Sequence, residues 1–437
     1  MQINILHTLR FKAITFAVMA FAAAISCTDF YESDFSTNLN NPEYKRPEGA
    51  TLTETPYYSN RVFVMFSLGF NDLSSFLASD FEDLTTGALP GYGFGEDVVL
   101  VLKHNTYENR NYSQRTSPVL IQLYKRNDKI ISETLKVFDE NTVAASASMI
   151  EEVLTYAKTK FPARSYGMLI SSHGTGWIPY SPDSDKNYSS FFRRSSSQHD
   201  EFPLTKSIGA HYDGSSSNSI EINIPDLAKA IPMHLDYIIF DACYMGGIEV
   251  AYELKDKCDK ICFSQTEILA EGMDYKSLLS SLFDFNEIDL LGIAENYFDQ
   301  YKNQSGIHRS ATISVVDCKK IESLSQIVAK HSETINKLAK SNERKSVQGY
   351  FRSSAHGVFY DLQDIIIKSG ANKDELEELN KALVNCVLCK YATEEFMATF
   401  LINNHCGLSM YLPDYDRYIL NDYYKSLKWN KATKLVK

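Results

Sequence analysis

The sequence predicts an α/β protein whose central sheet is mostly parallel and carries helices on both faces. Short apolar runs rich in β-branched and aromatic residues alternate with segments of helical period, which is typical of parallel sheets with crossover helices. One run, residues 237–240, passes through Asp241 and Cys243 into two glycines and then into apolar residues at helical spacing. A second run leads to His173. We therefore expect reactive side chains at the carboxyl ends of neighbouring strands, where open α/β sheets form their clefts.

Composition and charge limit the possible functions. Of the 437 residues, 44% are hydrophobic and 23% are charged, values that are typical of a globular protein with a large core. The formal net charge is −11, whereas proteins that bind nucleic acids need basic surfaces that neutralise phosphates. The acidic balance argues against a nucleic-acid partner and would weakly attract basic substrates.

The first 26 residues predict a secretion signal. A basic flank precedes an apolar stretch over residues 14–25, which is too short for a stable transmembrane helix, and small residues come directly before Cys27. This pattern resembles a bacterial lipobox, in which Cys27 becomes the lipidated N-terminus, although Ala24 stands where leucine is usual. We expect a cell-envelope lipoprotein at the outer membrane or cell surface that touches the membrane only through this anchor. Simple cleavage and secretion is the alternative.

Three regions are expected after the signal. Residues 27–58 are rich in Asn, Ser, Asp, Pro and Glu without an apolar period, and this predicts a flexible tether. Residues 59–325 should form the core of the sheet, interrupted at residues 181–219 by a polar insertion longer than an ordinary loop. Residues 326–437 should form a C-terminal α/β extension, in the same lobe or in a second one.

Strands and helices alternate within these regions. A helical period covers residues 148–160. Residues 379–390 also have a helical period, and no second ligand pair accompanies their Cys386 and Cys389, so core packing explains these thiols better than zinc binding. Strands are expected at residues 61–66, 97–102, 119–124, 166–172, 237–243, 260–265, 310–317 and 407–413.

Cys243 and His173 are candidates for a nucleophile and its base. The thiol of Cys243 would lie at the N-terminus of the following helix, which favours the thiolate. His173 follows an apolar run and precedes Gly174 and Gly176, which let the backbone turn sharply. Taken singly, a buried cysteine is most often inert and such a histidine most often structural. A Cys/His pair that two strands deliver to one edge of a sheet is much more specific to catalysis.

At these residues the chain resembles the clostripain-like cysteine peptidases, relatives of the caspase, gingipain and legumain group. Residues 173–177 (HGTGW) are similar to the histidine motif of that family, and residues 241–246 (DACYMG) are similar to its cysteine motif. The resemblance extends less specifically over residues 60–435, with departures at Gln265 and Met273. It implies a caspase-like sheet and a cysteine endopeptidase that acts on peptides or proteins without a cofactor. A calcium requirement is known in the family, but no motif marks a metal site here.

The mechanism that we expect is acyl transfer. The thiolate of Cys243 attacks the scissile carbonyl, and His173 protonates the leaving amine and then activates water. The backbone N–H groups of Cys243 and Gly174 would stabilise the oxyanion. His356 is a weaker candidate for the base, because no apolar strand precedes it.

Cleavage after Arg or Lys is the specificity that the resemblance implies. A cation removed from water needs a carboxylate partner. Asp241, two residues before the candidate nucleophile, matches the acidic position of the family's cysteine motif. Glu271 is a second candidate, because it lies in the loop after the next strand, and Glu267 and Asp274 are weaker ones. Alternatively, Asp241 caps the following helix.

The polar insertion offers a site for self-processing. In related peptidases, cleavage after a basic residue between the catalytic histidine and cysteine can accompany maturation, and Arg193 or Arg194 is the favoured site here. An unprocessed, solvated insertion is the alternative. Two other functions stay open: an inactive surface lipoprotein that binds peptide or glycan, and a related peptidase that cleaves after Asn or Asp.

Overall fold

The computed structural model describes residues 59–437 except 94, 108–113, 181–210, 213–218, 221, 285–286 and 353–356. Residues 58–437 form one compact unit. The predictions of a signal peptide, of lipidation at Cys27, of processing at Arg193 or Arg194 and of His356 as a rival base therefore lie outside the described residues. Within the described ranges, no helix is both long enough and apolar enough to cross a membrane.

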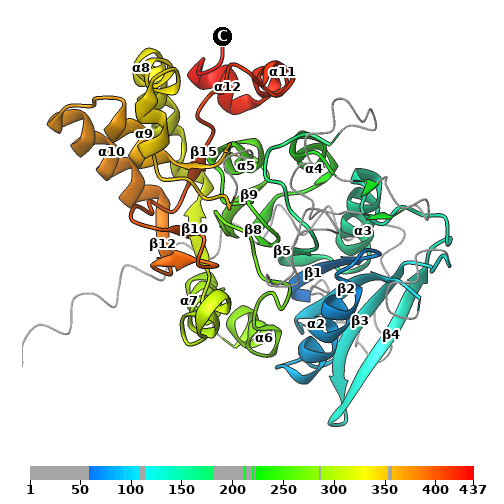
Figure 1. Cartoon of the computed structure of the whole chain (residues 1–437). Helices are drawn as coiled ribbons and strands as arrows, with labels where there is room; N and C mark the ends of the chain where they lie inside the picture. Colours follow the sequence, from blue (N-terminus) through cyan, green and yellow to red (C-terminus); the bar gives the residue numbers. More distant parts are fainter. Residues whose placement is uncertain are drawn as a thin grey trace, which may run out of the picture. The chain divides into compact units, whose positions relative to one another are not determined.

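A mixed sheet of nine strands forms the centre of the described chain (Figure 1). The five central strands β9, β8, β5, β1 and β2 are parallel to one another. Two further strands lie on each side of them, and each of these pairs antiparallel with its inner neighbour. The predicted α/β fold with a mostly parallel sheet is thus confirmed. From edge to edge, the order is β12 (Val387–Ala392), β10 (Thr312–Asp317), β9 (Cys258–Phe263), β8 (Leu235–Asp241), β5 (Ala163–Ser171), β1 (Ser59–Gly69), β2 (Val98–Asn105), β3 (Val119–Arg126) and β4 (Lys129–Val137).

Both faces of the sheet are covered by helices, because successive strand residues point to opposite sides. In β1, Val64 and Phe66 belong to one apolar cluster and Phe63 and Met65 to another. The first cluster includes side chains of α3 (Ala147–Lys160), α4 (Ile224–Ala230), α5 (Ile248–Leu254), α8 (Glu322–Ala339), α9 (Leu362–Lys368), α10 (Lys373–Cys386), α11 (Tyr418–Ser426) and α12 (Lys428–Thr433). The second includes side chains of α2 (Ser74–Thr86), α6 (Tyr275–Phe283) and α7 (Leu290–Lys302).

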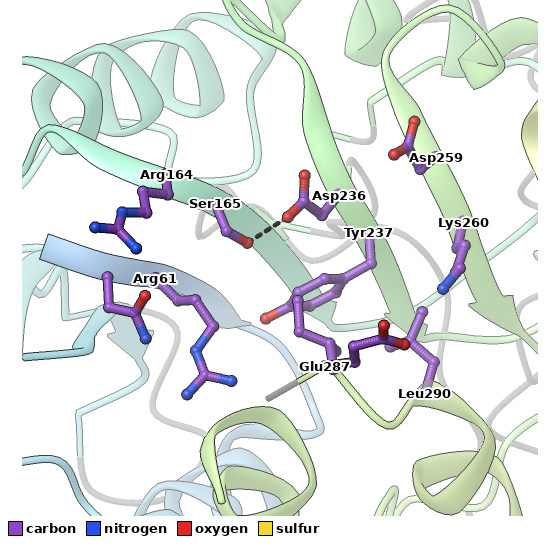
Figure 2. A pocket seen from close by; sticks show the side chains of 11 residues that line it. Arg61, Arg164, Ser165, Asp236, Tyr237, Asp259, Lys260, Glu287 and Leu290 are labelled. Atoms are coloured by element: carbon purple, nitrogen blue, oxygen red, sulfur yellow. Dashed lines mark hydrogen bonds between the residues drawn. The ribbon is translucent and has the colours of Figure 1, made fainter. Parts of the chain in front are cut away.

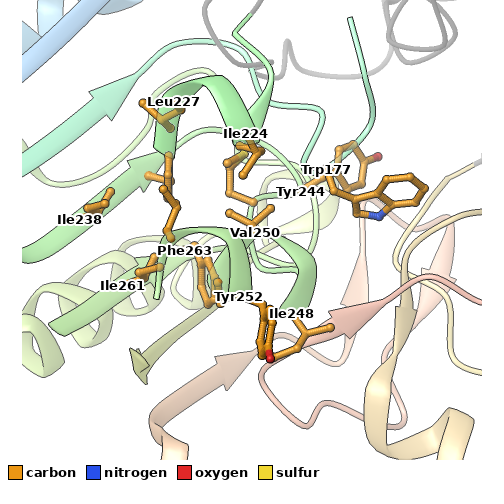
Figure 3. Close-up of a cluster of buried hydrophobic side chains, with 14 of the residues drawn as sticks. Trp177, Ile224, Leu227, Ile238, Tyr244, Ile248, Val250, Tyr252, Ile261 and Phe263 are labelled. Atoms are coloured by element: carbon orange, nitrogen blue, oxygen red, sulfur yellow. The ribbon is translucent and has the colours of Figure 1, made fainter. Parts of the chain in front are cut away.

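Figure 3 shows part of the first cluster, where Ile238 of β8 and Ile261 of β9 lie near Leu227 of α4 and Val250 of α5. This packing fixes α5, the helix that follows Cys243, against the sheet. The remaining short elements are the paired strands β6 (His211–Tyr212) and β7 (Ser219–Ile220), β11 (Tyr360–Asp361) and β15 (Ser409–Met410), β13 (Glu395–Phe396) and β14 (Phe400–Leu401), and the 3-10 helices η3 (Gly306–His308), η4 (Cys318–Lys320) and η5 (Asn342–Ser346).

One predicted helix is too long. The helical period over residues 379–390 predicted a single helix, but α10 ends at Cys386 and β12 begins at the next residue. The cause is tertiary: β10 offers an open edge, and β12 pairs with it antiparallel, with Cys389 opposite Val315. Backbone hydrogen bonds to a neighbouring strand here outweigh the local helical preference.

Glu249, in the first turn of α5, is a buried carboxylate that joins this helix to the C-terminal segment. Its Oε1 accepts hydrogen bonds from the backbone N–H of Tyr411 at 2.8 Å and from the hydroxyl of Tyr424 at 2.7 Å. Burial raises the pKa of Glu249 from 4.5 to about 7, because the desolvation of the charged form outweighs these two bonds.

The raised pKa of Glu249 predicts that the stability of the fold depends on pH. The substitution Glu249→Gln should remove this dependence. The folded protein binds the proton more tightly than the unfolded chain, so stability is lost as the pH rises from about 4.5 to about 7. At pH 8 the neutral glutamine should stabilise the fold by up to roughly 3 kcal/mol, and near pH 4.5 the difference should vanish. Urea unfolding at pH 5 and pH 8 measures this, with Glu151→Gln on the exposed side of α3 as the control. A variant that is less stable than the wild type at both pH values would contradict the prediction.

Candidate active site

Cys243 lies in a tight turn between β8 and α5, and its side chain is only 2% exposed. The next residue, Tyr244, has a φ of 59°, which is uncommon for a residue other than glycine. The turn is held by the segment after β9, because Thr266 O accepts a hydrogen bond from Tyr244 N at 2.8 Å. The Sγ of Cys243 accepts a hydrogen bond from Ile268 N at 3.2 Å and lies 3.6 Å from Ile268 O. The backbone N–H and C=O of Ile268 thus both contact the thiol.

His173 follows β5 by two residues, and its ring is bound by a carboxylate. Its Nε2 lies 2.5 Å from Oδ1 of Asp72. The acceptor on Asp72 favours the tautomer that is protonated at Nε2, and this leaves Nδ1 able to accept a proton. Asp72 itself follows β1, the parallel neighbour of β5, so three adjacent strands contribute to the same edge.

The histidine and cysteine turns are in direct backbone contact. In the register of the sheet, Ser171 of β5 pairs with Asp241 of β8, so both strands end at the same level. A Cβ added to Gly174 would lie 2.2 Å from the carbonyl oxygen of Cys243 and 2.6 Å from its backbone nitrogen. No side chain fits in that space, so a glycine is required for this approach. The structure therefore brings His173, Gly174 and Cys243 together at one edge of the sheet.

Asp241 is fully buried beside this turn. Its Oδ2 accepts hydrogen bonds from the hydroxyl groups of Ser171 at 3.0 Å and Tyr275 at 2.7 Å. Burial, and after it the charge of Asp241, raises the pKa of Tyr275 well above its usual value. The cap residue of α5 is Gly247, six residues after Asp241. Asp241 is therefore not the cap residue of this helix.

Glu271 is exposed in the turn that precedes α6, beside Gly272 with its φ of 64°. The hydroxyl of Tyr301, from α7, donates a hydrogen bond to Gly272 O at 2.7 Å. Burial is the main cause that raises the pKa of Tyr301, and the charges of Asp241 and Glu271 add to it. The charges of Asp241 and Glu271 thus both act on the ionisation of Tyr301.

Sequence reasoning missed several residues at this site. Asp72 is not among the candidates taken from the sequence, although it follows a parallel strand just as His173 does. Tyr301 of α7 gave no signal beyond an apolar helical face. Arg352, which pairs with Glu267 at 2.7 Å, comes from a segment 85 residues further along the chain and had no motif.

A cavity of about 480 Å³ lies at the opposite end of the same strands (Figure 2). Its lining includes Arg61 of β1, Ser165 of β5 and Tyr237 of β8, all near the amino ends of their strands. Ser165 donates a hydrogen bond to Asp236 there, and Arg61 is paired with Asp97 at 2.8 Å. Because the candidate nucleophile and base follow the carboxyl ends, this cavity is not part of the candidate active site.

Comparison with known proteins identifies the family. The model of the clostripain family matches residues 65–435. The chain belongs to the clostripain family. Among solved structures, an inactive zymogen of a C11 protease from Parabacteroides distasonis is 25% identical with a TM-score of 0.68, and the match covers 87% of this chain and 99% of that one. A secreted C11 cysteine protease from Bacteroides thetaiotaomicron, in complex with an irreversible peptide inhibitor, is 23% identical with a TM-score of 0.70, over 86% and 99% of the two chains.

None of the curated proteins matches this chain at a significant level. The family match confirms the predicted resemblance, and the enzyme class, a cysteine endopeptidase, is confirmed with it. Membership of this family favours a cysteine endopeptidase over the alternative of an inactive lipoprotein that binds peptide or glycan. Within the described ranges, no cluster of three or more His, Cys, Asp or Glu side chains could hold a metal ion.

Proposed function

We propose that this clostripain-family protease cleaves peptide bonds after Arg or Lys, with Cys243 as nucleophile and His173 as general base and acid. The observation that carries the proposal is the contact between the Gly174 and Cys243 backbones, which leaves no room for even one added carbon. This contact supports the pairing of Cys243 with His173, because His173 directly precedes Gly174 in the chain. It also supports an oxyanion site built from the backbone N–H groups of Gly174 and Cys243, since the two backbones lie in contact.

The chemistry follows from these positions. His173 accepts the thiol proton at Nδ1, and the Cys243 thiolate attacks the carbonyl carbon of the scissile bond to form a tetrahedral intermediate. The N–H groups of Cys243 and Gly174 stabilise its oxyanion. The imidazolium then protonates the leaving amine, and the thioester that remains is hydrolysed by a water that His173 deprotonates. Throughout, the carboxylate of Asp72 holds the ring and stabilises its positive charge.

Asp241 and Glu271 are the proposed partners of a basic substrate side chain. Asp241 supports this role because it is buried, accepts hydrogen bonds from the neutral hydroxyl groups of Ser171 and Tyr275, and lies two residues from the proposed nucleophile. Glu267, a weaker candidate in the sequence, is already paired with Arg352. A carboxylate close to the scissile bond would form a strong charge-assisted bond with a guanidinium or ammonium group of the substrate.

We carry two further proposals with this function. Self-cleavage after Arg193 or Arg194 would convert a precursor to the mature enzyme, and one similar structure is described as an inactive zymogen. Lipidation at Cys27, with a signal at residues 1–26 and a tether at residues 27–58, would hold the protease at the cell envelope. A similar C11 protease is described as secreted, which agrees with export and leaves release without an anchor as the alternative.

The proposed specificity predicts the outcome of a peptide panel. Fluorogenic peptides that differ only in the residue before the scissile bond should be hydrolysed when that residue is Arg or Lys, and not at all by Cys243→Ala. Asp241→Asn keeps the size but removes the charge, so kcat/KM for the basic peptides should fall about 10- to 100-fold.

Purified wild type, but not Cys243→Ala, should show fragments that end at Arg193 or Arg194. Cleavage of Asn or Asp peptides in place of basic ones, or activity of Cys243→Ala, would contradict the proposal.

The role of Asp72 predicts a defect in kcat. Asp72→Asn removes the charge that holds and stabilises the His173 ring, so kcat should fall about 100-fold or more while KM changes little. Asp259→Asn is the matched control, since Asp259 binds Nε2 of His234 at 2.7 Å near the amino end of β9, far along the strand from the site. Steady-state kinetics on one basic peptide compares the variants. Equal effects of the two substitutions would show that Asp72 has no special role.

A further inference from the structure

A buried ion pair lies beside the nucleophile, and the chemistry proposed above does not use it. Arg352 Nε lies 2.5 Å from Glu267 Oε2, and one terminal nitrogen of its guanidinium lies 2.7 Å from Oε1. The side chains are 25% and 7% exposed. A bidentate pair in such surroundings is stronger and more rigid than a surface ion pair. Breaking it would leave Glu267 as a buried, uncompensated charge.

The ion pair is connected to the thiol through a short backbone segment. Glu267 lies between Thr266, whose carbonyl accepts from Tyr244 N at 2.8 Å, and Ile268, whose N–H donates to Cys243 Sγ at 3.2 Å. The segment therefore bonds to the residue after the nucleophile and to its sulfur. Fixing the side chain of Glu267 also fixes the direction of the Ile268 N–H. A donor aimed at sulfur favours the thiolate over the thiol.

The charges of the pair also act on the site. Burial lowers the pKa of Arg352, but the charges of Glu267, Tyr244 and Cys243 outweigh this effect and raise it. The guanidinium and the thiol are therefore near enough to interact. A thiolate is favoured by the cation and opposed by the carboxylate, and in the intact pair the two effects largely cancel.

We infer that Arg352 and Glu267 are positioning residues for Cys243, which hold the Ile268 N–H on the sulfur and together set the acidity of the thiol. This inference rests on the proposed role of Cys243 as nucleophile. Other titratable groups near the thiol remain unchanged in the test that follows. They are the base His173 with Asp72, the carboxylate Asp241 of β8, the hydroxyl of Tyr244 in the same turn and the hydroxyl of Tyr297 from α7.

The test is the pH dependence of Cys243 alkylation by iodoacetamide, followed by loss of peptide hydrolysis and by mass spectrometry at Cys243. Glu267→Gln leaves the cation without its carboxylate, so the midpoint should move to lower pH. Arg352→Met leaves the carboxylate without its cation, so the midpoint should move to higher pH, by about one unit in each case. The double variant loses both charges and also the hold on the Ile268 N–H, so its midpoint should lie between those of the wild type and Arg352→Met. Arg352→Lys should show a smaller shift than Arg352→Met.

Controls separate this inference from a purely structural role and from the proposed function. Arg61→Met breaks another buried pair, Arg61 with Asp97, at the far end of β1, and should lower stability without moving the midpoint. If the two single variants at the site shift the midpoint in the same direction, or neither shifts it, the inference is wrong. If Cys243→Ala still hydrolyses peptides, the proposed function fails as well. If wild-type Cys243 is alkylated with loss of activity and only the shifts are missing, the proposed function stands without this inference.

Discussion

The active edge of this protein depends on one close approach, that of the Gly174 backbone to the Cys243 backbone. Two features of the chain make it possible. The register of β5 and β8 ends both strands at the same level, with Ser171 opposite Asp241. The missing side chain of Gly174 then lets the histidine turn lie directly on the cysteine turn. Without this contact, the proposed base and the proposed nucleophile, which are 70 residues apart in sequence, would share a sheet edge but would not be held close together.

Acidic side chains around this contact have different partners, and the partners separate their roles. Asp72 binds the imidazole of His173. Glu267 binds the guanidinium of Arg352. Asp241 accepts bonds from hydroxyl groups, and Glu271 is exposed. Because a carboxylate that is already paired with a cation has less to offer a substrate cation, Glu267 fits a role in recognition less well than Asp241 and Glu271, the acids proposed for it.

Much of the fold could be predicted because it depends on local patterns. The strands that end near His173 and Cys243 are continuous apolar runs, and the glycines after them mark the turns, so the candidate nucleophile, base and oxyanion donor could be named from sequence. Asp72 and Arg352 could not, since their partners lie 101 and 85 residues away and only the topology brings them close. The change from α10 to β12 was missed for the same reason, because pairing with β10 is a tertiary effect.

The most direct test of this account is the Gly174→Ala variant. Its added methyl group would overlap the Cys243 backbone, so the two turns must move apart, and kcat/KM for a basic peptide should fall at least about 100-fold as the base and one oxyanion donor are displaced. Gly91→Ala, where the added carbon would meet only the flexible carboxylate of Glu96, should keep wild-type activity. Wild-type kcat/KM in Gly174→Ala would contradict the claim that this contact assembles the active site.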